Sequence, residues 1–154
     1  MLNEGDNAPD FMASDTNGKT VKLADLLGSR VCLYFYPKDD TPGCTKQACS
    51  LRDSSSEFAR QNIKIYGVST DDAKSHQKFT DKFNLPFPLL ADTNHRVSEI
   101  YGVYGEKSMY GKTYMGIMRT TFLIDETGKI VKIFRKVKVE EHADEVLKAF
   151  KNTE

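Results

Sequence analysis

The chain has 154 residues, a length typical of one domain that can bury a hydrophobic core without disulfide bonds. Its hydrophobic content of 39% and charged content of 29% are those of an ordinary globular protein. The 22 basic and 22 acidic side chains balance, which argues against a protein that recruits nucleic acid or an anionic membrane surface.

A hairpin is predicted first, followed by strands and helices in alternation. Asn17-Gly18 separates two extended segments, and this dipeptide accepts the positive φ angles of a tight turn. The apolar runs that follow predict strands with helices between them. In residue numbers, we expect hairpin strands over 11–13 and 20–23, a short helical turn over 24–27, strands over 31–36, 63–69 and 88–91, and helices from 44 to about 61, from 73 to 83 and, capped by Asn94, up to 100.

The last third of the chain is predicted to return to the sheet. Residues 102–118 contain four glycines and several tyrosines without strong periodicity, and they predict a loop. Two strands over 119–124 and 129–135 flank a turn, and an amphipathic helix follows over 140–151. This order predicts a single α/β domain over residues 1–154, with a mixed sheet and helices on both faces.

Cys44 lies where a strand gives way to a helix. Pro37 breaks the apolar strand, and Pro42-Gly43 turn the chain immediately before Cys44. The thiol is therefore expected at a helix N-terminus, where unpaired backbone N–H groups and the helix dipole favour a thiolate. Cys49 follows five residues later on the same predicted helix. This arrangement favours a reactive cysteine with a nearby thiol partner over a pair of small buried hydrophobic residues.

The remaining polar residues predict no second site. Cys32 lies inside an apolar strand and is predicted to be an unreactive core residue. His76, His95 and His142 fall in separate predicted helices with polar neighbours, and we expect all three to be solvated. No grouping of cysteines and histidines has zinc spacing, so neither a metal nor a cofactor is expected. Asp39 and Asp40 are interpreted as turn formers.

Pro37, Thr41 and Cys44 match the P-x-x-x-T-x-x-C signature of the peroxiredoxins. The run over 34–45 with Ala48-Cys49, and the later stretch over 105–125, resemble the peroxiredoxin Q or bacterioferritin comigratory protein subfamily. The similarity covers nearly the whole chain. It implies a thioredoxin-like fold and a thiol peroxidase that reduces hydrogen peroxide and organic hydroperoxides in antioxidant defence.

The resemblance also implies roles for individual residues. Cys44 would be oxidised by peroxide to a sulfenic acid, and Cys49 would resolve it as an intramolecular disulfide that thioredoxin or a similar dithiol reductant recycles. Arg119 would be the active-site arginine, whose guanidinium favours the thiolate and holds peroxide oxygens. The Thr41 hydroxyl would fold back toward the sulfur, although threonine also suits a helix N-cap. Pro37 would shield the thiolate from solvent or simply end the strand.

Two other functions stay open at this point. A protein dithiol–disulfide oxidoreductase would share the fold but usually carries Cys-x-x-Cys, whereas four residues separate Cys44 from Cys49. A redox-responsive or metal-holding binding module is the second, although three cysteines with one close pair make a poor tetrahedral metal site.

The sequence has no apolar N-terminal leader and no apolar run of bilayer length. We therefore expect a cytoplasmic protein that acts on peroxide and a thioredoxin-like reductant. We expect it to be a monomer, with no nucleic-acid or membrane partner.

Overall fold

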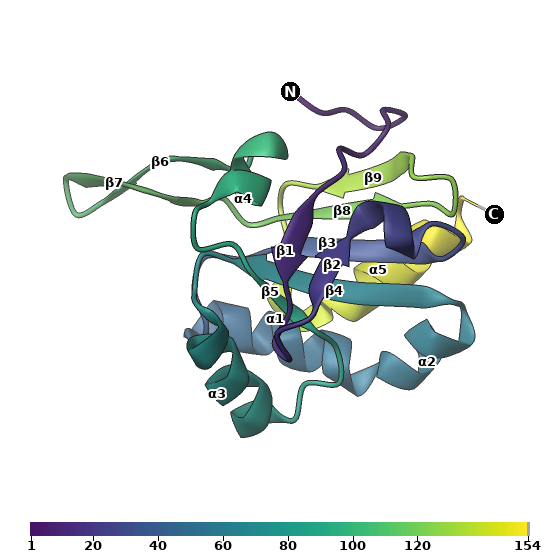
Figure 1. Ribbon diagram of the computed structural model, residues 1–154, viewed down its shortest axis with the longest axis horizontal. Helices are drawn as coiled ribbons and strands as arrows, with labels where there is room; N and C mark the ends of the chain where they lie inside the picture. The colour runs from purple at the N-terminus through teal and green to yellow at the C-terminus, as the bar shows by residue number, and fades with distance from the viewer. Residues whose placement is uncertain (154) are drawn as a thin grey trace.

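A seven-stranded mixed sheet forms the centre of the computed structural model, which describes residues 1–153 (Figure 1). A separate two-stranded hairpin extends from one side of it. The strands are β1 (Met12–Ser14), β2 (Thr20–Lys22), β3 (Arg30–Phe35), β4 (Ile63–Ser69), β5 (Leu89–Ala91), β6 (Tyr104–Met109), β7 (Lys112–Ile117), β8 (Thr120–Ile124) and β9 (Ile130–Phe134). The helices are α1 (Pro42–Asp53), α2 (Ser55–Arg60), α3 (Ala73–Phe83), α4 (Arg96–Ile100) and α5 (His142–Lys151), with 3₁₀ turns η1 (Leu23–Leu26) and η2 (Val139–Glu141).

The strand order is β2-β1-β5-β4-β3-β8-β9. β3 is parallel to β4, and β4 is parallel to β5, whereas β8 runs antiparallel to β3. In this register Phe35, the last residue of β3, pairs with Thr120, the first residue of β8. The segment from β3 to α1 and the segment that enters β8 therefore lie side by side at the same end of these two strands.

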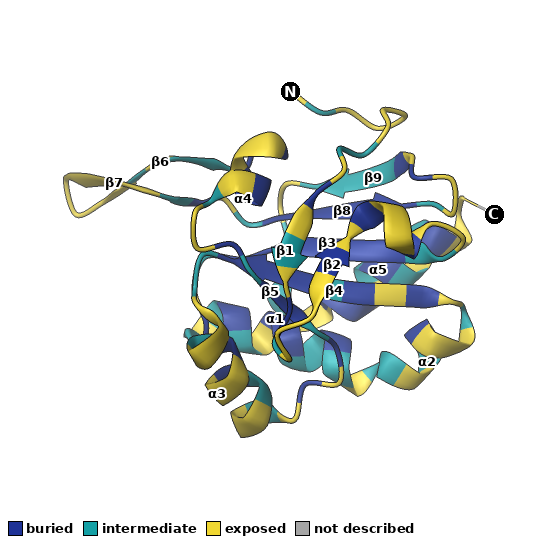
Figure 2. Cartoon of the chain, in the orientation of Figure 1, coloured by how far each residue is buried: buried dark blue, intermediate teal, exposed yellow. Residues whose placement is uncertain are grey.

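β3 is buried on both faces, as its dark colour in Figure 2 shows. Cys32 and Tyr34 point into a core cluster that also holds residues of α1, α2, α3 and α5. Leu33 and Phe35 point into the opposite cluster, which includes Val97 of α4. This alternation is that of a central strand covered by helices on both faces. The predicted mixed sheet and the core position of Cys32 are confirmed.

Residues 102–118, predicted as a loop, contain a complete β-hairpin instead. β6 and β7 pair antiparallel from Tyr104 opposite Ile117 to Met109 opposite Lys112. Tyr110 and Gly111 form the turn with φ values of 53° and 77°, the two positive angles that a two-residue hairpin turn needs. Most of its side chains are exposed on both faces, so the sequence carries no apolar alternation.

The predicted helix from 44 to about 61 is in fact two helices. α1 ends at Asp53, and Ser54 leaves helical geometry with φ −108° and ψ 15° before α2 begins. Serine side chains compete with the backbone for hydrogen bonds, and Ser54 is followed by two further serines.

Two smaller expectations also need correction. The first hairpin has a wider turn than Asn17-Gly18 alone, because the Asp15 N–H donates to the Lys19 carbonyl and only Gly18 of the pair has a positive φ. The N-cap position of α4 is His95, while the Asn94 side chain accepts a hydrogen bond from the N–H of Arg96.

Candidate active site

Cys44 is the third residue of α1, in the first turn of the helix. Thr41 is the N-cap residue, and Pro42 is the first helical residue. Proline suits that position because a backbone N–H there would have no intrahelical acceptor. The Cys44 side chain is buried, and its thiol is free. The backbone N–H groups of a first helical turn have no intrahelical acceptor, so this position favours an anion such as a thiolate.

Arg119 reaches Cys44 from the other end of the chain. It directly precedes β8, and its Nη2 atom donates to the Cys44 Sγ atom at 3.4 Å. A Cβ atom on Gly43 would lie 3.2 Å from the same Nη2, so the glycine leaves the room in which the guanidinium lies. The two predicted site residues are therefore brought together, as the pairing of β3 with β8 requires.

Gln47 is a member of this group that the sequence reasoning missed. Its side chain is fully buried, and its Oε1 atom accepts a hydrogen bond from Arg119 Nη1 at 2.5 Å. Its Nε2 atom has no hydrogen-bond partner among the described residues. Gln47 follows Cys44 by three positions, the spacing that places two side chains on one helix face. That spacing was the available signal, because a buried polar residue needs a partner.

Lys107 is a second residue that was missed, because its segment was predicted as a loop. Its Nζ atom donates to the Ile117 carbonyl at 2.9 Å, and its stem crosses the hairpin where Gly116 has no side chain. Burial lowers the Lys107 pKa, the charge of Arg119 lowers it further, and the charge on Cys44 raises it. Lys107 therefore adds a second positive charge near the Cys44 sulfur.

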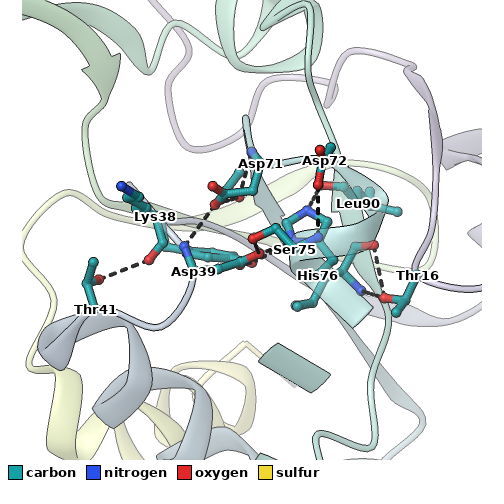
Figure 3. Close-up of polar contacts among 12 residues, drawn as sticks. Thr16, Lys38, Asp39, Thr41, Asp71, Asp72, Ser75, His76 and Leu90 are labelled. Atoms are coloured by element: carbon teal, nitrogen blue, oxygen red, sulfur yellow. Dashed lines mark hydrogen bonds and ion pairs between the residues drawn. The ribbon is translucent and has the colours of Figure 1, made fainter. Parts of the chain in front are cut away.

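The other predicted residues lie near Cys44 along the chain. The Thr41 hydroxyl donates to the Lys38 carbonyl at 2.9 Å and makes no capping bond, so Thr41 is an N-cap by backbone position only (Figure 3). Pro37 is half-buried between β3 and α1. Cys49 is a partly buried free thiol on α1, about one and a half turns after Cys44.

Two of the three histidines are buried, contrary to expectation. His76 on α3 and His142 on α5 have no solvent exposure, and each has hydrogen-bond partners at both ring nitrogens. Those partners compensate the lost hydration, which a sequence pattern does not reveal. His95 remains partly exposed and pairs with Glu99.

Asp39 is also more than a turn former. Its side chain is buried and accepts hydrogen bonds from Tyr36, Ser75 and His76. Asp40 is exposed, has a φ of 57°, and fits the turn role predicted for it.

The comparison with known proteins identifies the family to which this fold belongs. Residues 4–133 match the model of the AhpC/TSA family. The chain belongs to the AhpC/TSA family. This family member is 49% identical to peroxiredoxin Bcp of Bacillus subtilis, over 96% of the chain and 94% of the relative. It is equally identical to peroxiredoxin Bcp of Escherichia coli K12, over 95% and 94%.

Solved structures of peroxiredoxins agree. A cysteine-to-serine variant of PrxQ from Xylella fastidiosa superposes with a TM-score of 0.93 at 35% identity, over 99% of this chain and 98% of that one. A variant of peroxiredoxin Q from Xanthomonas campestris gives 0.88 at 41% identity, over 94% and 92%. The predicted subfamily, thioredoxin-like fold and thiol peroxidase class are confirmed. Among residues 1–153, no helix has the length and apolar character needed to cross a bilayer.

Proposed function

We propose that this peroxiredoxin reduces hydrogen peroxide and organic hydroperoxides with Cys44 as the nucleophile. The Cys44 thiolate attacks one peroxide oxygen, the O–O bond breaks, and the leaving oxygen takes a proton from solvent to become water or an alcohol. Cys44 becomes a sulfenic acid. The observation that supports this assignment best is the 3.4 Å contact between Cys44 Sγ and Arg119 Nη2. A structure of the Xanthomonas campestris bacterioferritin comigratory protein concerns alkyl peroxide reduction, which supports the organic substrates.

The residues around Cys44 then act on the first step. The Arg119 guanidinium favours the thiolate and donates to the peroxide oxygens, and the α1 N-terminus adds backbone donors. We assign Thr41 to the peroxide as a further hydroxyl donor, which requires it to turn from the Lys38 carbonyl. Half-buried Pro37 limits the access of water to the thiolate.

Cys49 is proposed to resolve the sulfenic acid. Its thiolate attacks the Cys44 sulfur, the S–O bond breaks, the hydroxide takes a proton from solvent to leave as water, and a disulfide forms. Both cysteines belong to α1, and Cα atoms five residues apart on an ideal helix are about 8 to 9 Å apart, whereas a disulfide tolerates about 7 Å. The helix must therefore open over about 44–52 when the bond forms. Opening breaks the hydrogen bond from the Ala143 N–H to the Ser50 Oγ, which now joins α5 to α1.

The disulfide in an opened helix would be accessible to a second protein. We propose a thioredoxin-like dithiol as the reductant that returns the chain to the reduced state. We further propose that the protein is a monomer, since the intramolecular pair needs no partner subunit. We also propose that it acts in the cytoplasm.

Peroxide consumption in the presence of a thioredoxin system tests these roles. Cys44→Ser is expected to abolish turnover, and Cys49→Ser to stop recycling by thioredoxin after one oxidation. Cys32→Ser should keep full turnover, because Cys32 is a buried core residue with no role in the proposed steps. Turnover by Cys44→Ser would refute the assignment. Mass spectrometry of the oxidised wild type should show the Cys44–Cys49 bond, and a Cys44–Cys44 link between chains would refute the intramolecular route.

A further inference from the structure

The segment between β3 and α1 is fastened through one buried carboxylate, that of Asp39 (Figure 3). Its Oδ1 atom accepts from the Tyr36 hydroxyl at 2.6 Å. Its Oδ2 atom accepts from the Ser75 hydroxyl at 2.8 Å and lies 2.7 Å from His76 Nδ1. The Asp39 N–H donates to Asp71 Oδ2 at 2.8 Å. Asp39 is thus joined to Tyr36, the residue after β3, to the segment after β4 and to α3 at once.

The hydrogen-bond partners of His76 determine where its protons are. Its Nε2 atom lies 2.9 Å from the Leu90 carbonyl, which only accepts, so Nε2 carries a hydrogen. Its Nδ1 atom faces a carboxylate oxygen that already accepts from Ser75, so a second proton lies between ring and carboxylate. The contact is therefore a buried hydrogen bond between the His76 ring and the Asp39 carboxyl group. Both ring nitrogens are engaged, and neither is free to bind a metal ion.

The neighbouring residues show where this fastening ends. Asp40 is exposed, has a left-handed backbone with φ 57°, and forms an exposed ion pair with Lys82. Exposed ion pairs of this kind contribute little to stability. Thr41, the next residue, is the N-cap of α1, which begins at Pro42. The backbone therefore passes from a buried, multiply bonded residue to an exposed one within a single step.

We infer that Asp39 and His76 are positioning residues that hold the entry to α1 in place, so that the opening of the helix on oxidation begins after Asp40. The inference rests on the proposed roles of Cys44 and Cys49. A fixed entry keeps the first turn of α1, and with it the Cys44 sulfur, against Arg119. It also returns the helix to the same place after each reduction.

Two successive steps then respond in opposite directions when the pair is weakened. Oxidation of Cys44 slows, because the sulfur and Arg119 are less well aligned, and small misplacements of reacting groups are costly. Formation of the Cys44–Cys49 disulfide accelerates, because α1 opens more easily. The contact between Asp39 and His76 therefore makes Cys44 oxidation faster and formation of the Cys44–Cys49 disulfide slower than they would be without it.

Stopped-flow kinetics of His76→Gln tests this, with hydrogen peroxide as the oxidant. We expect the rate constant of Cys44 oxidation to fall roughly tenfold and that of disulfide formation to rise. Two controls separate positioning from general loss of stability. His142→Gln removes an equally buried histidine from α5. Lys82→Ala breaks the exposed Asp40 ion pair and a cation–π contact with the neighbouring Phe83 ring, but leaves Asp39 and His76 in place. Neither control should shift the two rates in opposite directions. Unchanged rates in His76→Gln, or the same pattern in His142→Gln, would overturn the inference.

Amide hydrogen exchange of the wild type keeps the test decisive if His76→Gln fails to fold. The Asp39 amide should remain protected in both redox states while amides over 44–52 lose protection on oxidation. Equal loss at Asp39 would overturn the inference. If mass spectrometry shows no Cys44–Cys49 disulfide, the proposed resolving step fails by itself. Asp39→Asn in the reduced protein then tests the positioning alone: slower Cys44 oxidation and faster exchange over 38–41 support it, and no change in either refutes it.

Discussion

Arg119 Nη2 lies 3.4 Å from Cys44 Sγ across a sequence separation of 75 residues. The sheet makes this contact possible, because Phe35 at the end of β3 pairs with Thr120 at the start of β8. The chain leaves β3 for α1, and enters β8 from the hairpin, at the same end of this strand pair. Cys44, the proposed nucleophile, and Arg119 therefore come from two segments that the pairing of β3 with β8 brings together.

Arg119→Ala is expected to slow the oxidation of Cys44 by roughly a hundredfold, the usual effect of removing one fixed donor from a site where charge develops. Arg119→Lys should lose less, since it keeps a charge but cannot donate to Cys44 and Gln47 as a planar fork. Stopped-flow measurement with hydrogen peroxide gives both rate constants. A rate constant for Arg119→Ala equal to that of the wild type would show that the arginine has no part in the first step.

Gln47→Met tests whether the buried amide orients Arg119. Methionine keeps the length of the side chain and the helix propensity but offers no strong acceptor to Arg119 Nη1. We expect Cys44 oxidation to slow by about tenfold, equivalent to about 1.4 kcal/mol, because a hydrogen bond to a charged group is lost. A matched substitution at partly buried Thr45 on the same helix, Thr45→Met, should leave the rate near that of the wild type. Equal rates in the two variants would contradict the orienting role.

The position of Cys44 at the start of α1 was predictable from local sequence, and its partners were not. Pro42-Gly43 before Cys44 fixed the strand-to-helix transition, so the position of the thiol at the start of α1 could be derived from the residues. Arg119 was found only through the family resemblance, since a strand end gives no sign of what it faces across the sheet. Gln47 was missed because a glutamine on a helix is ordinarily solvated.

Buried polar side chains are the features that the sequence patterns predict least well. His76 and His142 have polar neighbours in sequence, yet both lie on the inner faces of their helices and pair with residues far along the chain. Asp39 likewise has a local role as a turn residue and a tertiary role through α3. Helical periodicity marks the buried face of a helix but does not identify the partner that makes a polar group tolerable there.

Gly43→Ala should separate activity from stability. The added Cβ atom would lie 3.2 Å from Arg119 Nη2, at the end of a flexible side chain that can shift. Alanine in a helix is favoured over glycine, so urea unfolding should show equal or slightly higher stability. Cys44 oxidation should nevertheless slow, because the guanidinium moves off the sulfur. Unchanged oxidation would show that the glycine is not needed for the Arg119 position.

Gly67→Ala is the contrasting case in the core. Its Cβ atom would lie 2.8 Å from carbon atoms of Tyr34 and Leu89, both fully buried side chains. Overpacking of this kind costs about 1 to 3 kcal/mol of unfolding free energy, which urea titration resolves. A variant as stable as the wild type would mean that Tyr34 can shift without cost.

His142 predicts how stability depends on pH. Burial lowers its pKa most, and the charge of Arg119 lowers it further, although the hydrogen bond and the charge of Glu145 raise it. The neutral ring fits its partners, since Nδ1–H donates to Glu145 and Nε2 accepts from the Thr121 hydroxyl. In the unfolded chain the same ring takes up a proton near its ordinary pKa of about 6.5. Below that pH the unfolded state binds more protons than the folded state, so the unfolding free energy must fall with decreasing pH.

The expected result is a loss of stability from about pH 6.5 downward that continues until the pH falls below the lowered pKa of the folded state. Urea unfolding of the wild type and of His142→Gln at pH 7.5, 6.5 and 5.5 measures it. The glutamine variant starts from lower stability, because a satisfied buried ring is lost, but its unfolding free energy should decline less over the same range. Every other titratable group is common to the two proteins, so the difference between the two slopes reports His142 together with its interaction with Glu145. Parallel declines would show that the ring is protonated as readily in the folded protein as in the unfolded chain, and that burial beside Thr121 does not hold it neutral.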